Sequence, residues 1–349
     1  MQTLNISGRE IGPGLPAYVI AEISANHNQS LTKALDLITL AKSAGADAVK
    51  IQTYKPETIT IDCDNDYFRI GSGTIWEGKN LFQLYSEAYT PWEWHAQLFA
   101  HAKTEGITVF SSPFDETAVD LLEKLDAPAY KIASFEMVHL PLIRRVATTG
   151  KPMIISTGMG TLAEIAEAVE TAREAGCREL ALLKCTSAYP APPEEANLRT
   201  IPHLAEAFQV PAGLSDHTMG SAVAVASVCL GGCIVEKHFT KSRAVPGPDS
   251  AFSMEPAEFK AMVADIRTAE KALGRVSYEL TEKEKASRVF RRSIFVVKDI
   301  PEGEMITLEN VRVIRPGHGL PPGQFDKVIG RKAKITLKRG EPLKWDCLG

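Results

Sequence analysis

Short apolar runs alternate with amphipathic segments along the first three quarters of the chain. The apolar runs are rich in valine and isoleucine and mostly lack polar alternation, which is typical of parallel strands buried on both faces. We expect a strand at each of eight runs: 18–23, 48–52, 108–112, 129–134, 152–157, 179–186, 212–216 and 234–239.

The segments between these runs carry apolar residues near a period of 3.6 and predict helices. In 31–44, for example, Leu31, Leu35 and Ile38 share one face, and Gly45 suits a C-cap. Eight strands alternating with eight helices over about 255 residues have the usual size of a (β/α)₈ TIM barrel. A doubly wound open sheet is the alternative, although no predicted strand is followed by a G-x-G-x-x-G turn. The other predicted helices are 93–105, 116–125, 140–149, 161–175, 198–208, 221–230 and 256–273.

Two parts of the chain depart from this alternation. A long insertion, 53–91, follows the second predicted strand, and in a barrel such a loop lies over the catalytic mouth. Beyond residue 273, a highly charged segment precedes short β-like runs at 293–297, 311–314 and 334–337. We therefore expect a barrel domain over 1–280, a linker over 281–292 and a small, mostly β domain over 293–349.

The composition is that of a soluble globular protein, with 44% hydrophobic and 23% charged residues. A formal net charge of -4 gives no reason to expect nucleic-acid binding. No apolar run approaches the roughly 20 residues that cross a bilayer, and residues 1–5 lack the features of a secretory signal. We expect a cytoplasmic protein with neither a membrane nor a nucleic-acid partner. The six cysteines form no C-x-x-C pair, which predicts reduced thiols.

Ionisable side chains lie near the ends of the predicted strands, where TIM barrels carry their active sites. Four lysines interrupt apolar runs, and a buried, unpaired lysine costs several kcal/mol or loses its proton. Phosphate and carboxylate groups of a substrate would be suitable partners. The alternative is that each lysine pairs with a barrel carboxylate such as Glu22 or Glu236. The lysines are Lys50, Lys131, Lys184 and Lys237, and hydroxyls that could surround a phosphate are those of Ser112, Ser134, Ser156 and Ser215.

His217 and His238 end neighbouring predicted strands. Two neutral imidazoles can bind Mn²⁺, Fe²⁺ or Zn²⁺, and with waters and a substrate oxygen they would form an open Lewis-acid site. The alternative is a pair of histidines that only form hydrogen bonds. A Schiff base on Lys131 or Lys184, as in class I aldolases, is a further possibility.

Eight motifs at the strand ends, taken in barrel order, resemble those of the sialic acid synthase family. Similarity continues through 247–249 (GPD) and 315–319 (RPGHG), and the latter resembles the antifreeze-like (SAF) domain that follows the barrel in this family. The resemblance implies a TIM barrel followed by a small SAF domain. The motifs are 21–28 (AEISANHN), 50–53 (KIQT), 112–115 (SPFD), 131–134 (KIAS), 156–159 (STGM), 185–190 (CTSAYP), 213–218 (GLSDHT) and 236–239 (EKHF).

Within the family, the segments 75–79 (IWEGK), 89–94 (YTPWEW) and 184–190 (KCTSAYP) are most similar to pseudaminic acid synthases. N-acetylneuraminate synthases more typically have His and Asn where Lys184 and Ser187 stand. The resemblance implies condensation of phosphoenolpyruvate with 2,4-diacetamido-2,4,6-trideoxy-L-altrose, which releases phosphate and forms a nine-carbon sugar acid. The alternatives are a legionaminate or N-acetylneuraminate synthase that uses another amino sugar, or a non-enzymatic binding protein with a SAF domain.

The resemblance also implies roles for single residues. Glu22, His217 and His238 would be catalytic, and the two histidines would bind a divalent metal ion, Mn²⁺, Mg²⁺ or Co²⁺. Arg315 would reach into the active site of a partner subunit, which implies a domain-swapped homodimer. Phosphoenolpyruvate would be bound by Lys50, Ser112, Lys131, Ser134, Ser156, Lys184, Ser187 and Ser215. The amino-sugar aldehyde would be bound by Asn28, Gln52, Tyr189, Asp249 and Arg315.

Overall fold

The computed structural model describes residues 3–71 and 76–349, and the chain divides into two compact units at Gly274. The first unit contains eight parallel strands that form a closed barrel, because β10 (Ile234–His238) pairs with β3 (Tyr18–Glu22). Closure excludes the doubly wound alternative and confirms the predicted TIM barrel. The other barrel strands are β4 (Ala48–Thr53), β5 (Thr108–Pro113), β6 (Tyr130–Ile132), β7 (Met153–Ser156), β8 (Leu180–Cys185) and β9 (Ala212–Asp216).

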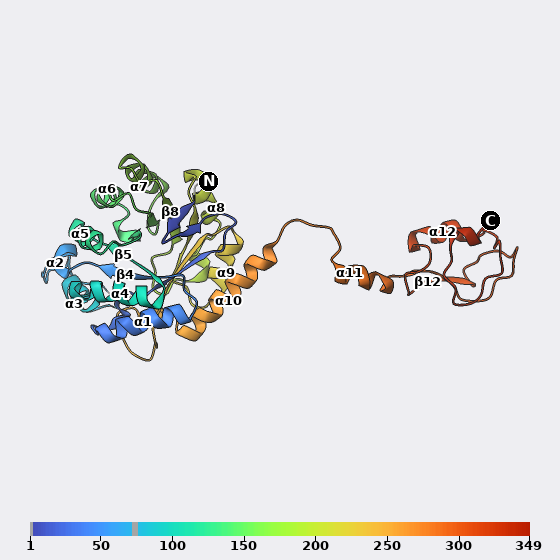
Figure 1. Ribbon diagram of the computed structural model, residues 1–349, viewed down its shortest axis with the longest axis horizontal. Coiled ribbons are helices and arrows are strands. Elements are labelled where there is room, and N and C mark those ends of the chain that lie inside the picture. Colours follow the sequence, from blue (N-terminus) through green and yellow to red (C-terminus); the bar gives the residue numbers. More distant parts are fainter. Residues whose placement is uncertain (1–2, 72–75) are drawn as a thin grey trace. The chain divides into compact units, whose positions relative to one another are not determined.

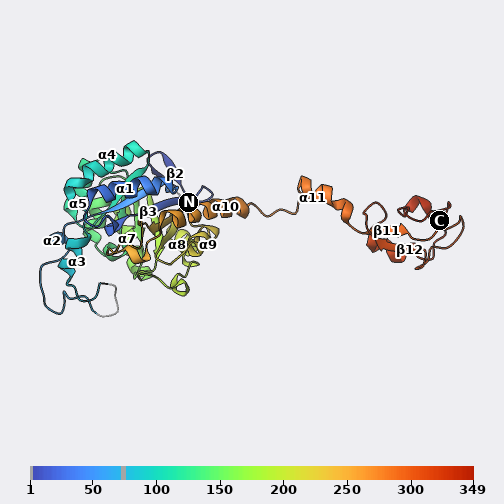
Figure 2. The ribbon, with the colours of Figure 1, turned by 90° about the horizontal axis from the view of Figure 1, so that it is seen from below.

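Helices surround the barrel strands in both views of the ribbon (Figure 1 and Figure 2). All eight predicted helices are present, and their ends differ from the predicted ends by no more than the usual one or two residues. None of the described helices is long and apolar enough to span a bilayer. The eight are α1 (Leu31–Ser43), α4 (His95–Glu105), α5 (Glu116–Lys124), α6 (Leu140–Ala147), α7 (Leu162–Glu174), α8 (Thr200–Phe208), α9 (Ala222–Cys229) and α10 (Pro256–Leu273).

A short N-terminal hairpin, which the sequence pattern did not predict, fills one end of the barrel. Its strands are β1 (Leu4–Ile6) and β2 (Arg9–Ile11). Three apolar hairpin side chains join one buried cluster with the inward-facing side chains of the barrel strands. The hairpin therefore packs under the barrel and leaves the carboxyl ends of the strands as the end at which a site can form. The hairpin side chains in this cluster are Leu4, Ile6 and Ile11.

The long insertion after β4 contains two further helices, α2 (Pro56–Ile59) and α3 (Leu81–Ala88). Residue 75, the first of the segment 75–79, lies outside the described residues. The next residue ties the insertion to the loop after β10, because the indole Nε1 of Trp76 donates a hydrogen bond to the Pro248 carbonyl at 2.9 Å. The insertion thus contributes side chains to the carboxyl end of the barrel.

The second unit, Arg275–Gly349, has its own apolar core around a two-stranded antiparallel sheet. The sheet pairs β11 (Ser293–Val296) with β12 (Val311–Ile314), close to two of the predicted runs. The predicted strand at 334–337 is wrong, since Leu337 forms only an isolated bridge with Ile300. The charged segment before the sheet forms a short helix, α11 (Glu282–Ser287), and a second short helix, α12 (Phe325–Val328), follows the sheet.

Candidate active site

Alternation along each strand decides which polar side chains face the barrel axis. In β10, Ile234 belongs to the inward cluster and Val235 to the outer one. The same alternation directs Glu236 and His238 inward and Lys237 outward. In β8, Leu183 is inward, so Cys185 faces the axis and Lys184 faces the outer layer.

Two of the four predicted site lysines therefore lie outside the barrel interior. Lys237 forms a buried ion pair with Asp216 at 2.6 Å and donates to the Thr218 carbonyl at 2.6 Å. Lys184 is only half-buried, and its Nζ donates to the Cys185 carbonyl at 2.8 Å and the Thr186 hydroxyl at 3.2 Å. The structure does not bring Lys184 into the group of inward-facing residues that was predicted to bind phosphoenolpyruvate. A substrate role for Lys237 is wrong, because Asp216 neutralises it.

Lys50 lies between two inward carboxylates. Its Nζ is 2.6 Å from Glu22 Oε2 and 3.2 Å from Glu236 Oε1, and it donates to the Ser112 hydroxyl at 3.2 Å. All of these side chains are almost fully buried. For Lys50, the alternative of pairing with a barrel carboxylate is correct. Burial raises the pKa of Glu22 to about 7 although Lys50 opposes the shift.

Lys131 is less well neutralised than Lys50. Its Nζ donates to the Ser156 hydroxyl at 2.7 Å and to the Ile132 carbonyl at 3.1 Å, and the nearest carboxylate oxygen, on Glu236, is 4.0 Å away. Burial lowers the pKa of Lys131 to about 8, although Glu236 opposes the shift. A buried ammonium group with so distant a counter-ion favours binding of an anion beside it.

Serine hydroxyls crowd around one glycine next to this lysine. The Gly158 amide donates to the Ser134 hydroxyl at 3.1 Å. A Cβ at Gly158 would lie 2.7 Å from Ser134 Oγ and 2.3 Å from Ser187 Oγ, so only glycine leaves the hydroxyls where they are. Ser215 also faces the axis and donates to Glu236 Oε1 at 3.3 Å. The predicted hydroxyls thus gather on one side of the lysines.

The two histidines lie side by side, with ring centroids 5.3 Å apart. His217 Nδ1 donates to the Thr186 carbonyl at 2.9 Å, and although burial opposes the shift, Cys185 and this carbonyl raise the pKa of His217. His238 Nδ1 is buried and has no hydrogen-bond partner among the described residues, and burial together with His217 keeps the pKa of His238 well below its usual range. The unpartnered nitrogen of His238 suits a metal ligand. Within 3–71 and 76–349, no three His, Cys, Asp or Glu side chains are arranged to hold a metal.

Cys185 was not predicted as a site residue, yet its inward position brings it to the centre of the site. Its Sγ lies 3.9 Å from His217 Nδ1 and 3.8 Å from the Ser187 hydroxyl. Burial alone would raise the pKa of the Cys185 thiol. His217, Ser134 and Lys131 outweigh burial, and the pKa of the thiol falls to about 6. The alternation of β8 could have indicated this residue, had the strand's register been known.

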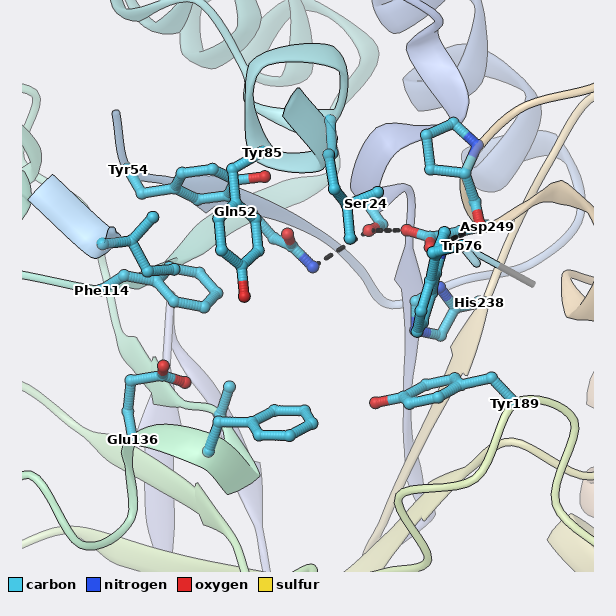
Figure 3. A pocket seen from close by; sticks show the side chains of 16 residues that line it. Ser24, Gln52, Tyr54, Trp76, Tyr85, Phe114, Glu136, Tyr189, His238 and Asp249 are labelled. Carbon is cyan, nitrogen blue, oxygen red and sulfur yellow. Dashed lines mark hydrogen bonds between the residues drawn. The ribbon is translucent and has the colours of Figure 1, made fainter. Parts of the chain in front are cut away.

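A cavity of about 210 Å³ opens beside His238 (Figure 3). Three of the residues predicted to bind the sugar line it, namely Gln52, Tyr189 and Asp249. Gln52 Nε2 donates to the Ser24 hydroxyl at 3.0 Å, and that hydroxyl donates to Asp249. A connected row of polar groups therefore runs along one side of the cavity.

The other two predicted sugar-binding residues are not in this cavity. Asn28 Nδ2 donates to the Pro246 carbonyl at 3.0 Å, and its Oδ1 lies against Gly247. Asn28 therefore holds the loop that carries Asp249, and a direct contact with the sugar is not supported. Arg315 is an exposed residue of the second unit, directly after β12.

Sequence reasoning missed the opposite side of the cavity. Glu136 lies there, across from Tyr189 and Asp249 (Figure 3). Burial raises the pKa of Glu136 to about 7, and its Oε2 has no hydrogen-bond partner in the described part of the chain. The remaining side chains on this side are apolar or aromatic, and they come from loops whose positions the strand pattern does not fix. They are Tyr54, Ile59, Leu84, Tyr85, Ala88, Phe114 and Phe135.

The fold and the site together define a TIM-barrel enzyme whose axial site, lined by buried lysines, carboxylates and serine hydroxyls, lies beside a cavity at the carboxyl ends of the strands. Comparison with known protein families agrees. Residues 37–278 match the NeuB family and residues 291–349 match the SAF domain. The chain belongs to the NeuB family, and the resemblance to the sialic acid synthases is confirmed.

Curated relatives cover nearly the whole chain. It is 46% identical to the pseudaminic acid synthase of Campylobacter jejuni, over 94% of this chain and 95% of the relative. It is 44% identical to the pseudaminic acid synthase of Helicobacter pylori, over 95% of this chain and 97% of the relative. Among solved structures, an N-acetylneuraminic acid synthetase of Leptospira borgpetersenii superposes with a TM-score of 0.72 at 29% identity, over 82% of this chain and 95% of that one.

Proposed function

We propose that this protein condenses phosphoenolpyruvate with 2,4-diacetamido-2,4,6-trideoxy-L-altrose to form pseudaminic acid and phosphate. The observation that carries the proposal is that Lys131, bonded to the Ser156 hydroxyl, reaches to within 4.0 Å of Glu236 in β10, the strand that also carries His238 at the edge of the cavity. One region can thus bind a small, highly charged substrate while the adjoining cavity binds a sugar. The identities of 44–46% to pseudaminic acid synthases support this sugar over N-acetylmannosamine.

Lys50 and Lys131 bind the phosphate and carboxylate of phosphoenolpyruvate in this proposal, assisted by Ser112, Ser134 and Ser156. Lys50 is paired with Glu22 in the free protein. Because burial raises the pKa of Glu22 to about 7, protonation of this carboxyl near neutral pH leaves Glu236, at 3.2 Å, as the only one of the two carboxylates that still neutralises Lys50, which favours binding of the substrate anion. Fixing two reactants side by side can contribute roughly 7–11 kcal/mol of barrier reduction.

The reaction balances with one water molecule. Carbon 3 of phosphoenolpyruvate bonds to the aldehyde carbon, the hydroxyl of water bonds to carbon 2, and the bond from carbon 2 to the phosphate oxygen breaks. The aldehyde oxygen gains a proton, and Glu22 at the end of β3 is placed to transfer it or to orient the aldehyde. Gln52, Tyr189 and Asp249 hold the sugar on the polar side of the cavity.

A divalent ion fits the two imidazoles, because the unpartnered Nδ1 of His238 is a suitable donor and the ring of His217 lies beside it. His217 and His238 would hold Mn²⁺, Mg²⁺ or Co²⁺, with the remaining positions left to water and substrate. The ion would act as a Lewis acid toward the aldehyde oxygen.

The test combines an activity assay with metal analysis. Phosphate release is measured with phosphoenolpyruvate and each candidate sugar in turn: the trideoxy-altrose, the legionaminate precursor and N-acetylmannosamine. The His217→Ala and His238→Ala variants should lose both turnover and bound metal. Wild-type turnover in either variant after chelation would refute the metal role, and faster turnover with another sugar would refute the substrate. Borohydride trapping of Lys131 with phosphoenolpyruvate would support a Schiff base instead.

Arg315 belongs to the same proposal as a contact supplied by a second copy of the chain in a domain-swapped homodimer. The family resemblance and the exposure of Arg315 support this arrangement. Mixing inactive Arg315→Ala and His238→Ala proteins should restore part of the activity, because one mixed site then has both residues. No recovery after subunit exchange, verified by labelled subunits, would refute the shared site. A cytoplasmic location also remains a prediction.

A further inference from the structure

We propose that the apolar side of the cavity selects amino sugars by their methyl groups, so that the insertion after β4 determines substrate specificity. This inference rests on the proposed function, because it assumes that an acetamido sugar occupies the cavity. Seven side chains form this apolar wall: those of Tyr54, Ile59, Leu84, Tyr85, Ala88, Phe114 and Phe135.

The apolar wall is built partly by the barrel and partly by the insertion. Tyr54 and Phe114 directly follow β4 and β5, and their rings pack edge to face with centroids 5.0 Å apart. Tyr85 of α3 packs against Tyr54 from another side, at 5.7 Å. Ile59 ends α2, and Leu84 also belongs to α3. Of the side chains in the apolar wall that do not directly follow a strand, most therefore belong to the insertion.

The two sides of the cavity have different chemistry, and they face each other (Figure 3). Ser24 and Asp249 lie opposite Tyr54 and Phe114. Trp76 belongs to the insertion but lies on the polar side, beside Asp249 and His238 (Figure 3), and it donates to the Pro248 carbonyl at 2.9 Å. Among the described residues that line the cavity, Glu136 is the one carboxyl group on the side of the apolar wall, so a ligand that fills the cavity meets mostly polar groups on one side and mostly hydrocarbon on the other.

A sugar with acetamido groups and a terminal methyl group has this two-sided character. Its hydroxyls suit the polar side, whereas its acetamido methyls and the methyl at C6 suit the apolar wall. Burial of one methyl group is worth about fourfold in affinity. A hydroxyl at C6 that lay against Leu84 and Ile59, rather than beside Glu136, would lack a hydrogen-bond partner and would cost about 10- to 100-fold. The apolar wall thus favours 6-deoxy sugars over their 6-hydroxy counterparts.

The experiment compares two aldehydes that differ only at C6: 2,4-diacetamido-2,4,6-trideoxy-altrose and 2,4-diacetamido-2,4-dideoxy-altrose. Phosphate release at saturating phosphoenolpyruvate gives kcat/KM for each. We expect the wild type to prefer the deoxy sugar by about 10- to 100-fold. Leu84→Asn should lower kcat/KM for the deoxy sugar by about tenfold and bring the preference down to a few-fold, since an amide can bond the C6 hydroxyl. The KM for phosphoenolpyruvate should stay within about twofold, because Leu84 lies away from the lysines.

A second variant and a control make the result decisive. Ile59→Thr keeps a β-branched side chain, although a shorter one, and it tests the apolar wall from α2 if Leu84→Asn fails to fold. Phe82→Ala removes an aromatic group from α3 that does not line the cavity, and it should leave the preference unchanged. Preference ratios in folded Leu84→Asn and Ile59→Thr equal to the wild-type ratio would overturn this inference alone. A wild type that acts only on 6-hydroxy sugars would overturn the proposed function as well.

Discussion

Replacement of Glu136 by glutamine should stabilise the free protein at alkaline pH and have little effect at acidic pH. Burial beside the aromatic side chains raises the pKa of this carboxyl from 4.5 to about 7. An acid whose pKa is raised in the folded state contributes stability that is fully present below pH 4.5. That stability is lost as the pH rises to about 7, because the folded protein must then bury a charge. Glutamine has the same shape and never carries the charge.

The expected size follows from the shift. A pKa difference of about 2.5 corresponds to roughly 3.4 kcal/mol at 1.36 kcal/mol per unit, and partial exposure of the side chain reduces this to about 2–3 kcal/mol. Most of the gain should appear between pH 5 and pH 8. The free energy of unfolding is measured by urea denaturation of both proteins at these two values, with tryptophan fluorescence as the signal.

Glu167→Gln provides the matched control, since Glu167 is an exposed residue of α7 in the same barrel. Its effect on the free energy of unfolding should be nearly the same at pH 5 and pH 8. The reasoning about Glu136 fails if Glu136→Gln also gives the same difference at both values. It fails equally if the variant becomes less stable than the wild type as the pH rises.

Two further substitutions separate the outer lysine from the substrate site. Lys237→Met should cost about 3–5 kcal/mol in the free energy of unfolding, because it leaves Asp216 buried and unpaired. The KM of the folded variant for phosphoenolpyruvate should stay near the wild-type value. A large rise in that KM would show that Lys237 does contact the substrate. Gly158→Ala should raise the KM for phosphoenolpyruvate by about tenfold or more, because the new Cβ displaces the hydroxyls of Ser134 and Ser187. The free energy of unfolding should fall by less than about 1 kcal/mol. An unchanged KM for Gly158→Ala would show that these hydroxyls do not contact that substrate.

The barrel itself was predictable because long, strongly patterned segments determine it. The run at 212–216 and the helix at 256–273 were predicted with the bounds that the structure has. The hairpin of β1 and β2 was not, since two strands of three residues leave no recognisable periodicity. The opposite error occurs at 334–337, where a strand was expected but only Leu337 forms an isolated bridge.

Site residues were harder to predict for a related reason. Side chains alternate along a strand with a period of two, so an error of one residue in register moves a side chain to the other face. Lys184 and Cys185 are neighbours in β8, and only the structure tells which faces the axis. Glu136 lies in the short turn after β6 and Tyr85 in α3 of the long insertion after β4, and the strand pattern fixes the position of neither. Lys50, Lys131 and His238 do face the axis, as the alternation of their strands shows, and His217 directly follows β9; their roles in binding remain predictions.

The hairpin under the barrel has a consequence for the protons of the reaction. Below the charged residues, the axis is filled by fully buried apolar side chains, including Ile20, Phe110 and Ile154, with Leu4 and Ile6 beneath them. No chain of water molecules can pass through this plug. If the two substrates fill the mouth as proposed, the interior has no path to bulk solvent through the opposite end of the barrel. Each proton released during a turnover must then be kept by a neighbouring group or leave with a product.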